Sequence, residues 1–183
     1  MRTKTALVVA MSALAILASS VSFADNHAGA TTFQIGDGYY FFAQKRHVKN
    51  TALPNIAISY DLDQRWAMEA GAGVFNTNQT GTAAQQGVHG WVYTIDGIYR
   101  FNPRGRLAPY VLAGPSIISL KPAGNNPVDQ AAINAGIGTQ YFIDKQIAFF
   151  AEAKDLYTLS GGKNDALLNF GMSFLFGGNA TSA

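Results

Sequence analysis

The chain has 183 residues, no cysteine and few charges, since Asp, Glu, Lys and Arg make up 13% of it, against about 25% in ordinary soluble domains. The absence of cysteine excludes disulfides, thiolate nucleophiles and cysteine metal sites. Without Arg2 and Lys4, which lie in a predicted leader, eleven basic residues remain against eleven acidic ones, and this balance argues against nucleic acid as a partner.

The first 24 residues have the pattern of a secretory signal peptide. Arg2 and Lys4 precede an apolar run over 6–18, and Ser22-Phe23-Ala24 follows it. A basic start, a short apolar stretch and a small-x-small site predict cleavage after Ala24. A retained helical anchor is the alternative, but the run is short for a transmembrane helix. We expect a signal peptide over 1–24, one β-barrel domain over 25–176 and a short C-terminal tail over 177–183.

Apolar and polar residues alternate along the rest of the chain. The pattern is clearest from Trp91 to Phe101, where the residues at every second position are apolar or Gly. A period of two predicts a strand with two unlike faces. The register of the first strand, which contains Gly36-Asp37-Gly38, stays ambiguous. In chain order, the predicted strands cover 33–43, 53–62, 66–76, 88–101, 107–119, 130–143, 147–157 and 166–176, each long enough to cross a bilayer as a tilted strand.

The connections between these strands alternate in length. Turn-rich links at 61–65, 102–105 and 144–146 are short. The stretches between them are longer and polar, at 44–52, 77–87, 120–129 and 158–165. Short turns at one rim and long loops at the other are typical of outer-membrane barrels. The pattern therefore predicts an all-β fold, an eight-stranded antiparallel up-and-down transmembrane β-barrel with both termini at the short-turn rim.

Alternation alone does not say which face points inward. A soluble ligand-binding barrel would enclose the apolar face. Here the polar face is rich in Gly, Ala, Ser and Asn, which suits the narrow interior of an eight-stranded barrel. The other face carries aromatic residues near the strand ends, where a membrane interface favours them. We assign Trp66, Trp91, Tyr99, Phe101, Tyr110, Tyr141 and Phe176 to this outward face, so a membrane barrel is expected.

Two segments resemble the OmpA-like family of small outer-membrane barrels. Pro109-Tyr110-Val111-Leu112-Ala113-Gly114, after the turn at 102–105, is similar to that family's fifth strand, and 169–176 is similar to its closing strand. The resemblance covers residues 31–176 and implies a Gram-negative cell outer membrane as the location. It also implies folding by the barrel-assembly machinery, with Phe176 as the terminal aromatic assembly signal. No peptidoglycan-binding domain is expected, because the sequence ends seven residues after Phe176.

Five charged residues fall on the predicted polar faces. A cation on the lipid face near the midplane would cost about 2–4 kcal/mol, so these residues are expected to point into the lumen and to pair, the two cations against the three carboxylates. Structural packing is the favoured interpretation, and a gate or a proton-conducting file is the alternative. The residues are Glu69, Asp96, Arg100, Glu152 and Lys154.

The first long loop carries a basic cluster, Lys45, Arg46, His47 and Lys49. Charge-assisted hydrogen bonds from Lys45, Arg46 and Lys49 to lipopolysaccharide phosphates are the functional interpretation, and a solvated loop is the alternative. Outer-membrane lipid and lipopolysaccharide are therefore the expected partners of a monomeric protein.

Catalysis has little support in the sequence. His27, His47 and His89 are the histidines, and no triad can be assembled from them, because a base needs hydrogen-bond reach to its nucleophile. No catalytic residue, cofactor or metal is predicted. We expect a structural protein that maintains envelope integrity or presents loops for surface contact. A narrow channel resembling OmpW-like barrels is the first alternative, and a lipid A-modifying enzyme is the second.

Overall fold

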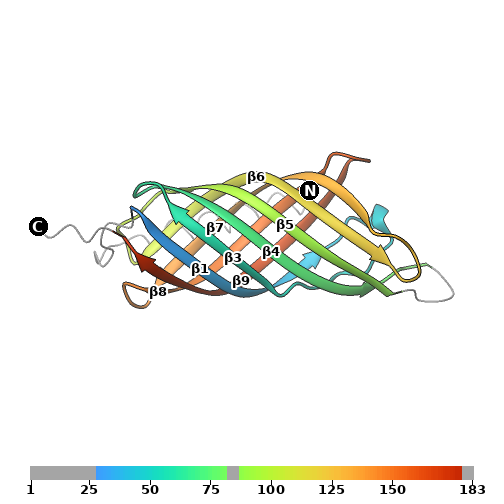
Figure 1. Cartoon of the computed structure of the whole chain (residues 1–183), viewed down its shortest axis with the longest axis horizontal. Helices are drawn as coiled ribbons and strands as arrows, with labels where there is room; N and C mark the ends of the chain where they lie inside the picture. Colours follow the sequence, from blue (N-terminus) through green and yellow to red (C-terminus); the bar gives the residue numbers. More distant parts are fainter. Residues whose placement is uncertain (1–27, 82–86, 179–183) are drawn as a thin grey trace, which may run out of the picture.

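Antiparallel strands form a closed barrel in the computed structural model, which describes residues 28–81 and 87–178 (Figure 1). β1 pairs with both β2 and β3, each strand from β3 to β8 pairs with the next along the chain, and β1 also pairs with β9, which closes the sheet. Besides the 3-10 turn η1 (Gln44–Arg46), the described elements are β1 (Ala30–Phe41), β2 (Thr51–Ala52), β3 (Asn55–Asp61), β4 (Trp66–Asn78), β5 (Gly87–Arg100), β6 (Leu107–Pro122), β7 (Val128–Phe142), β8 (Ile147–Thr158) and β9 (Lys163–Gly177).

The second predicted strand is interrupted. Residues 53 and 54 separate β2 from β3, and Pro54 has no N–H to donate to a ladder. Both pieces pair with β1, so β2 and β3 together take one place in the wall. The described strands therefore make an eight-stranded antiparallel barrel, as predicted.

The ambiguous first strand begins at Ala30, three residues earlier than predicted, and ends at Phe41. Its outward residues include Phe33, Ile35 and Tyr39, and its inward residues include Thr32 and Gln34. Ala30 pairs with Gly177 at the short-turn rim. The first and last strands thus begin and end at the same rim, as an eight-stranded meander requires.

Three of the four predicted long loops are shorter than expected, because the strands continue past the apolar positions. β6 extends to Pro122 and β7 starts at Val128, while β8 and β9 leave only 159–162 between them. Pairing between neighbouring strands continues through these extensions. The connection after β1 remains long, and we call residues 42–50 loop 1.

Large apolar side chains cover the outside of the barrel. Ile56, Ile58, Ile95 and Ile133 are each at least half exposed. Aromatic residues lie at the strand ends, and the rings of Trp66 and Tyr99 meet at 4.9 Å between centroids. None of the described helical segments is long and apolar enough to span a membrane. Lipid, rather than a second layer of protein, is what a surface of this kind requires.

Tyr110 is a correction to the outward aromatic set. It is 3% exposed and points into the lumen, because the inward positions of β6 are the even ones. Gly138 on the neighbouring strand makes room for its ring, since a Cβ there would collide with it. The other aromatics assigned to the outward face are exposed or half-buried on the outside.

Candidate functional site

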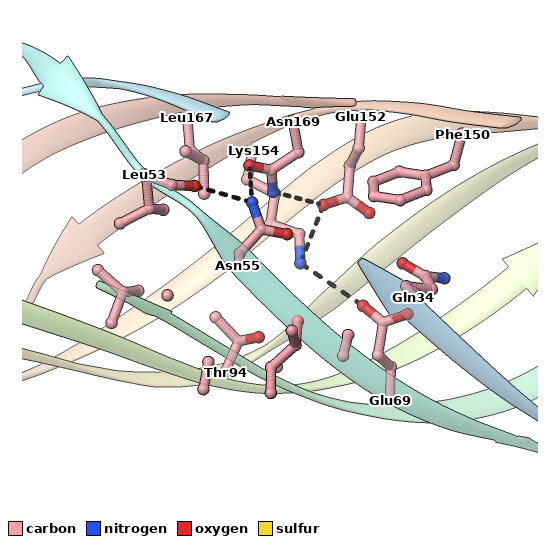
Figure 2. Close-up of a pocket in the computed structure, with 16 residues that line it drawn as sticks. Gln34, Leu53, Asn55, Glu69, Thr94, Phe150, Glu152, Lys154, Leu167 and Asn169 are labelled. Carbon is pink, nitrogen blue, oxygen red and sulfur yellow. Dashed lines mark hydrogen bonds and ion pairs between the residues drawn. The ribbon is translucent and has the colours of Figure 1, made fainter. Parts of the chain in front are cut away.

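Four charged side chains meet in the middle of the lumen, and we call them the ion layer: Glu69, Asp96, Glu152 and Lys154. Lys154 on β8 lies at the centre, with Nζ 2.8 Å from Asp96 Oδ2, 3.1 Å from Glu152 Oε1 and 3.9 Å from Glu69 Oε1. Figure 2 shows Lys154 reaching Glu152 and Glu69 across the interior. The register pairs Glu69 with Asp96 on β4 and β5, so two acids face one cation from the opposite wall.

The ion layer is buried and hydrogen-bonded. Each of its four residues is at most 7% exposed. Tyr110 Oη donates to Glu152 Oε2 at 3.0 Å, and Asn134 Nδ2 donates to Asp96 Oδ1 at 2.8 Å. Asn169 Nδ2 donates to Glu152 Oε1 at 3.4 Å. A buried ion group is stable only when such bonds satisfy its remaining atoms, and here inward side chains of three strands, β6, β7 and β9, supply them.

Arg100 does not join the ion layer through an ion pair. Its guanidinium forms an ion pair with Asp61 at 2.8 Å. Both residues lie at the ends of their strands, nearer the short-turn rim than the ion layer, and Asp61 is 1% exposed. Asp61 lies in the first predicted turn, 61–65. The alternation along β3 could have predicted its inward position. Ala57 and Ser59 point inward, and the next position with the same period of two is Asp61.

Apolar side chains fill the lumen between the ion layer and the loop rim. We call this cluster the apolar plug. Phe75 occupies the space that Gly90 leaves, because a Cβ on Gly90 would collide with the ring. Its members are Tyr40, Phe42, Leu53, Phe75, Val92, Ile118, Ala132, Leu156 and Leu167, all at most 7% exposed.

Loop 1 folds over the apolar plug and is fixed there by Asp165. Arg46 Nε donates to Asp165 Oδ1 at 2.8 Å, and its NH2 lies 2.8 Å from Oδ2. Tyr40 Oη donates to Asp165 Oδ2 at 2.9 Å, and the backbone N–H of Ala43 donates to Oδ1 at 2.8 Å. Arg46 also donates to Gln130 and Thr158 on two further strands. We call this group the latch.

The latch corrects one prediction about the basic cluster. The Arg46 side chain is 2% exposed, so it is engaged in the mouth of the barrel and does not face lipopolysaccharide. Lys45 and Lys49 are exposed. Asp165 lies before the last predicted strand, 166–176, but in the structure it belongs to β9 and continues the inward series of Leu167 and Asn169.

The remaining candidate residues lie apart from the lumen. Phe176 is on the outer surface of β9, 60% exposed. The His89 ring contacts the Asn76 side chain on the outside of the barrel. His27, the leader over 1–24 and most of the tail over 177–183 lie outside the described residues. In the described part of the chain, no group of three or more His, Asp or Glu side chains could hold a metal ion.

The ion layer borders a small cavity, lined among others by Glu69, Thr94 and Asn169 (Figure 2). Its volume of about 30 Å³ is close to that of one water molecule. Beyond it the plug and the latch occupy the mouth. The site is thus the closed interior of a transmembrane barrel, in which buried ion pairs and hydrogen bonds lie inside an apolar outer belt. This arrangement defines the class of small outer-membrane β-barrels.

Comparison with known proteins agrees with that class and specifies the family. The model of the OprF membrane domain family matches residues 1–180, so the chain belongs to this OmpA-like barrel family and is an outer-membrane β-barrel protein. No relative among the curated proteins matches the sequence significantly.

Three solved structures show the same fold. The N-terminal β-barrel domain of Pseudomonas aeruginosa OprF is 19% identical, with a TM-score of 0.59, over 81% of this chain and 98% of that one. OprG from the same organism is 13% identical, with a TM-score of 0.66, over 86% and 99%. Ail, the attachment invasion locus protein of Yersinia pestis, in complex with the heparin analogue sucrose octasulfate, is 14% identical, with a TM-score of 0.55, over 81% and 99%.

Proposed function

We propose that this protein is a closed, structural barrel that supports the integrity of the outer membrane and presents its loops at the cell surface. The observation that carries the proposal is the filled lumen. The ion layer, the apolar plug and the latch follow one another along the barrel interior. A filled interior favours stability over conduction, because eight strands leave room for little more than side chains.

Conductance tests the closed state. The purified barrel, reconstituted in a planar bilayer, is expected to give no steady current, with at most brief and small openings. A variant with Phe42→Ala and Phe75→Ala, which empties part of the apolar plug, serves as the comparison. A large steady current through the unmodified protein would overturn the proposal and favour the narrow channel that resembles OmpW-like barrels.

We also propose that the outer leaflet is the immediate partner of the loop rim. Short turns face the periplasm in this class of barrel, so loop 1 belongs at the cell exterior. Lys49 is exposed there, and its backbone N–H donates to the carbonyl of Asn78 at the end of β4. Its exposed ammonium group supports a contact with lipopolysaccharide phosphates. Lys45 lines the mouth instead.

Lys49→Gln should weaken lipopolysaccharide binding about two- to threefold, since one exposed ion pair contributes little. Unchanged binding would remove Lys49 from the contact.

A purely structural role implies no chemical change in the surrounding lipid. Lipopolysaccharide incubated with the reconstituted barrel should keep its acyl composition by mass spectrometry. Loss or gain of an acyl chain would support the lipid A-modifying alternative.

Export and assembly complete the proposal. The leader over 1–24 is removed after Ala24, so the mature protein should begin at Asp25 by mass analysis. Phe176, exposed at the end of β9, is the residue offered to the barrel-assembly machinery. Phe176→Ala should lower the amount of folded barrel in the outer membrane several-fold, while refolding of the purified chain in detergent stays efficient. Equal loss in both settings would show a folding defect rather than a recognition defect.

A further inference from the structure

The mouth of the barrel contains a second pocket, separate from the lumen cavity. Its volume is about 210 Å³, and it lies between loop 1 and the ends of β5, β6, β7 and β9. This volume is below the 300–1,000 Å³ of pockets for drug-sized ligands. It suits a small molecule with one ring, two fused rings or a short chain.

Five of the ten described residues that line this pocket are apolar, namely Val48, Val88, Leu120, Pro122 and Val128. Val88 is 2% exposed, and Val48 and Leu120 pack against the apolar plug. Val128 borders the opening and is 53% exposed. A ligand that covers this surface gains from removing apolar area from water.

Two lysines give the pocket its charge. Lys45 and Lys163 both line it, and none of its described lining residues is acidic. Neither lysine has an ion-pair partner among the described residues, whereas the third cation, Arg46, is neutralised by Asp165. The latch therefore leaves two uncompensated ammonium groups beside an apolar wall.

We propose that this pocket binds a small amphipathic anion from outside the cell, an aryl or short alkyl carboxylate. The apolar body would lie against Val48, Val88 and Leu120, and the carboxylate would accept hydrogen bonds from Lys45 and Lys163. This binding activity goes beyond the structural role and does not depend on it. The ligand would enter the mouth from outside, so binding requires no path through the barrel.

Methyl NMR on the full barrel in lipid nanodiscs tests the proposal. Titration with 2-naphthoate should give saturable shifts of the Val48, Val88 and Val128 methyl signals. The neutral 2-naphthylmethanol should bind more weakly, and the cationic 2-naphthylmethylamine at least tenfold more weakly. Val111, on the lipid face, reports partition of each probe into the bilayer and separates that effect from binding in the mouth.

Substitution of the lysines tests the charge. Lys45→Gln with Lys163→Gln should weaken naphthoate binding about fivefold and leave the neutral alcohol unchanged. Lys121→Gln, an exposed lysine of β6 that does not line the pocket, is the matched control and should change neither. The absence of saturable shifts, equal binding of naphthoate and the amine, or a double variant that binds like the parent would each overturn the proposal.

Discussion

Single residues in the lumen matter through the charge that they leave behind when they are changed. Lys154 faces three carboxylates, Asp165 faces Arg46, and every one of these side chains is almost fully buried. Removing one member of a buried ion group costs about 3–5 kcal/mol, because the remaining charge has no water around it. Each of these buried positions is therefore expected to be sensitive to a change of charge. Exposed positions at the rim of the barrel are expected to tolerate the same change.

Lys154→Met tests the centre of the ion layer. The substitution keeps most of the volume but leaves Glu69, Asp96 and Glu152 facing one another, so the free energy of unfolding should fall by about 3–5 kcal/mol. Urea unfolding in lipid vesicles measures it. Lys121→Met, at an exposed position, should change it by less than about 0.5 kcal/mol; similar losses in both variants would contradict the buried layer.

Arg46→Ala tests the latch. It leaves the carboxylate of Asp165, which is 0% exposed, without its cation, and a loss of about 3 kcal/mol is expected. Hydrogen exchange at the amides of loop 1 should accelerate, because Ala43 donates to the same carboxylate. Adding Asp165→Asn should recover part of the stability. A double variant no better than Arg46→Ala would mean that the charge of Asp165 is not the cause.

Asp63 provides a pH-dependent contribution outside the membrane. Its Oδ1 accepts hydrogen bonds from the N–H groups of Trp66 and Arg65 in the turn after β3. These bonds, that of Trp66 first, lower the pKa of the exposed carboxyl. A lowered pKa means that the ionised form stabilises the turn above the unfolded pKa, and that this contribution disappears as the pH falls through the folded value. Carbon-detected NMR titration should place the Asp63 pKa below that of free aspartate, and Asp63→Asn should remove the effect.

At the scale of the strand, alternation predicted which side chains face lipid and which face the lumen. It succeeded where a strand is regular, as in Glu69 and Lys154, because a period of two follows from backbone geometry alone. It missed Asp61 and Asp165, which lie at strand ends where polar residues look like turns. It also missed the inward position of Arg46, since the path of loop 1 depends on distant contacts with β8 and β9 rather than on its own sequence.

β1 carries a carboxylate on the lipid face. Asp37 of β1 is exposed on the outside, opposite Phe170 of β9 and between Ile35 and Tyr39. Among the described residues no cation pairs with it, and its carboxylate accepts only the N–H of Gly38. Asp37→Leu should therefore stabilise the barrel in lipid by about 1 kcal/mol, since acids on the lipid face cost less than bases. Asp129→Leu at the loop rim should have almost no effect, and a destabilised Asp37→Leu would show that this carboxylate has a partner.

The whole molecule combines an outer surface adapted to lipid with an interior filled by its own side chains. The fold and the outer-membrane location follow from features that repeat along the chain, and the family was predicted from the resemblance of two segments, 109–114 and 169–176. The plug and the latch could not be predicted, because they bring loop 1 together with residues from strands all around the barrel wall only once the sheet has closed.

That closure has a consequence for how the chain can be built. β1 pairs with β9 along its entire length, from Ala30 opposite Gly177 to Phe41 opposite Ala166, as the adjacent blue and red strands of Figure 1 show. Until the last segment arrives, two rows of unmatched amide and carbonyl groups stay open, which hydrocarbon does not tolerate. A shortened chain without β9 should consequently fail to insert at all, rather than yield a smaller cylinder.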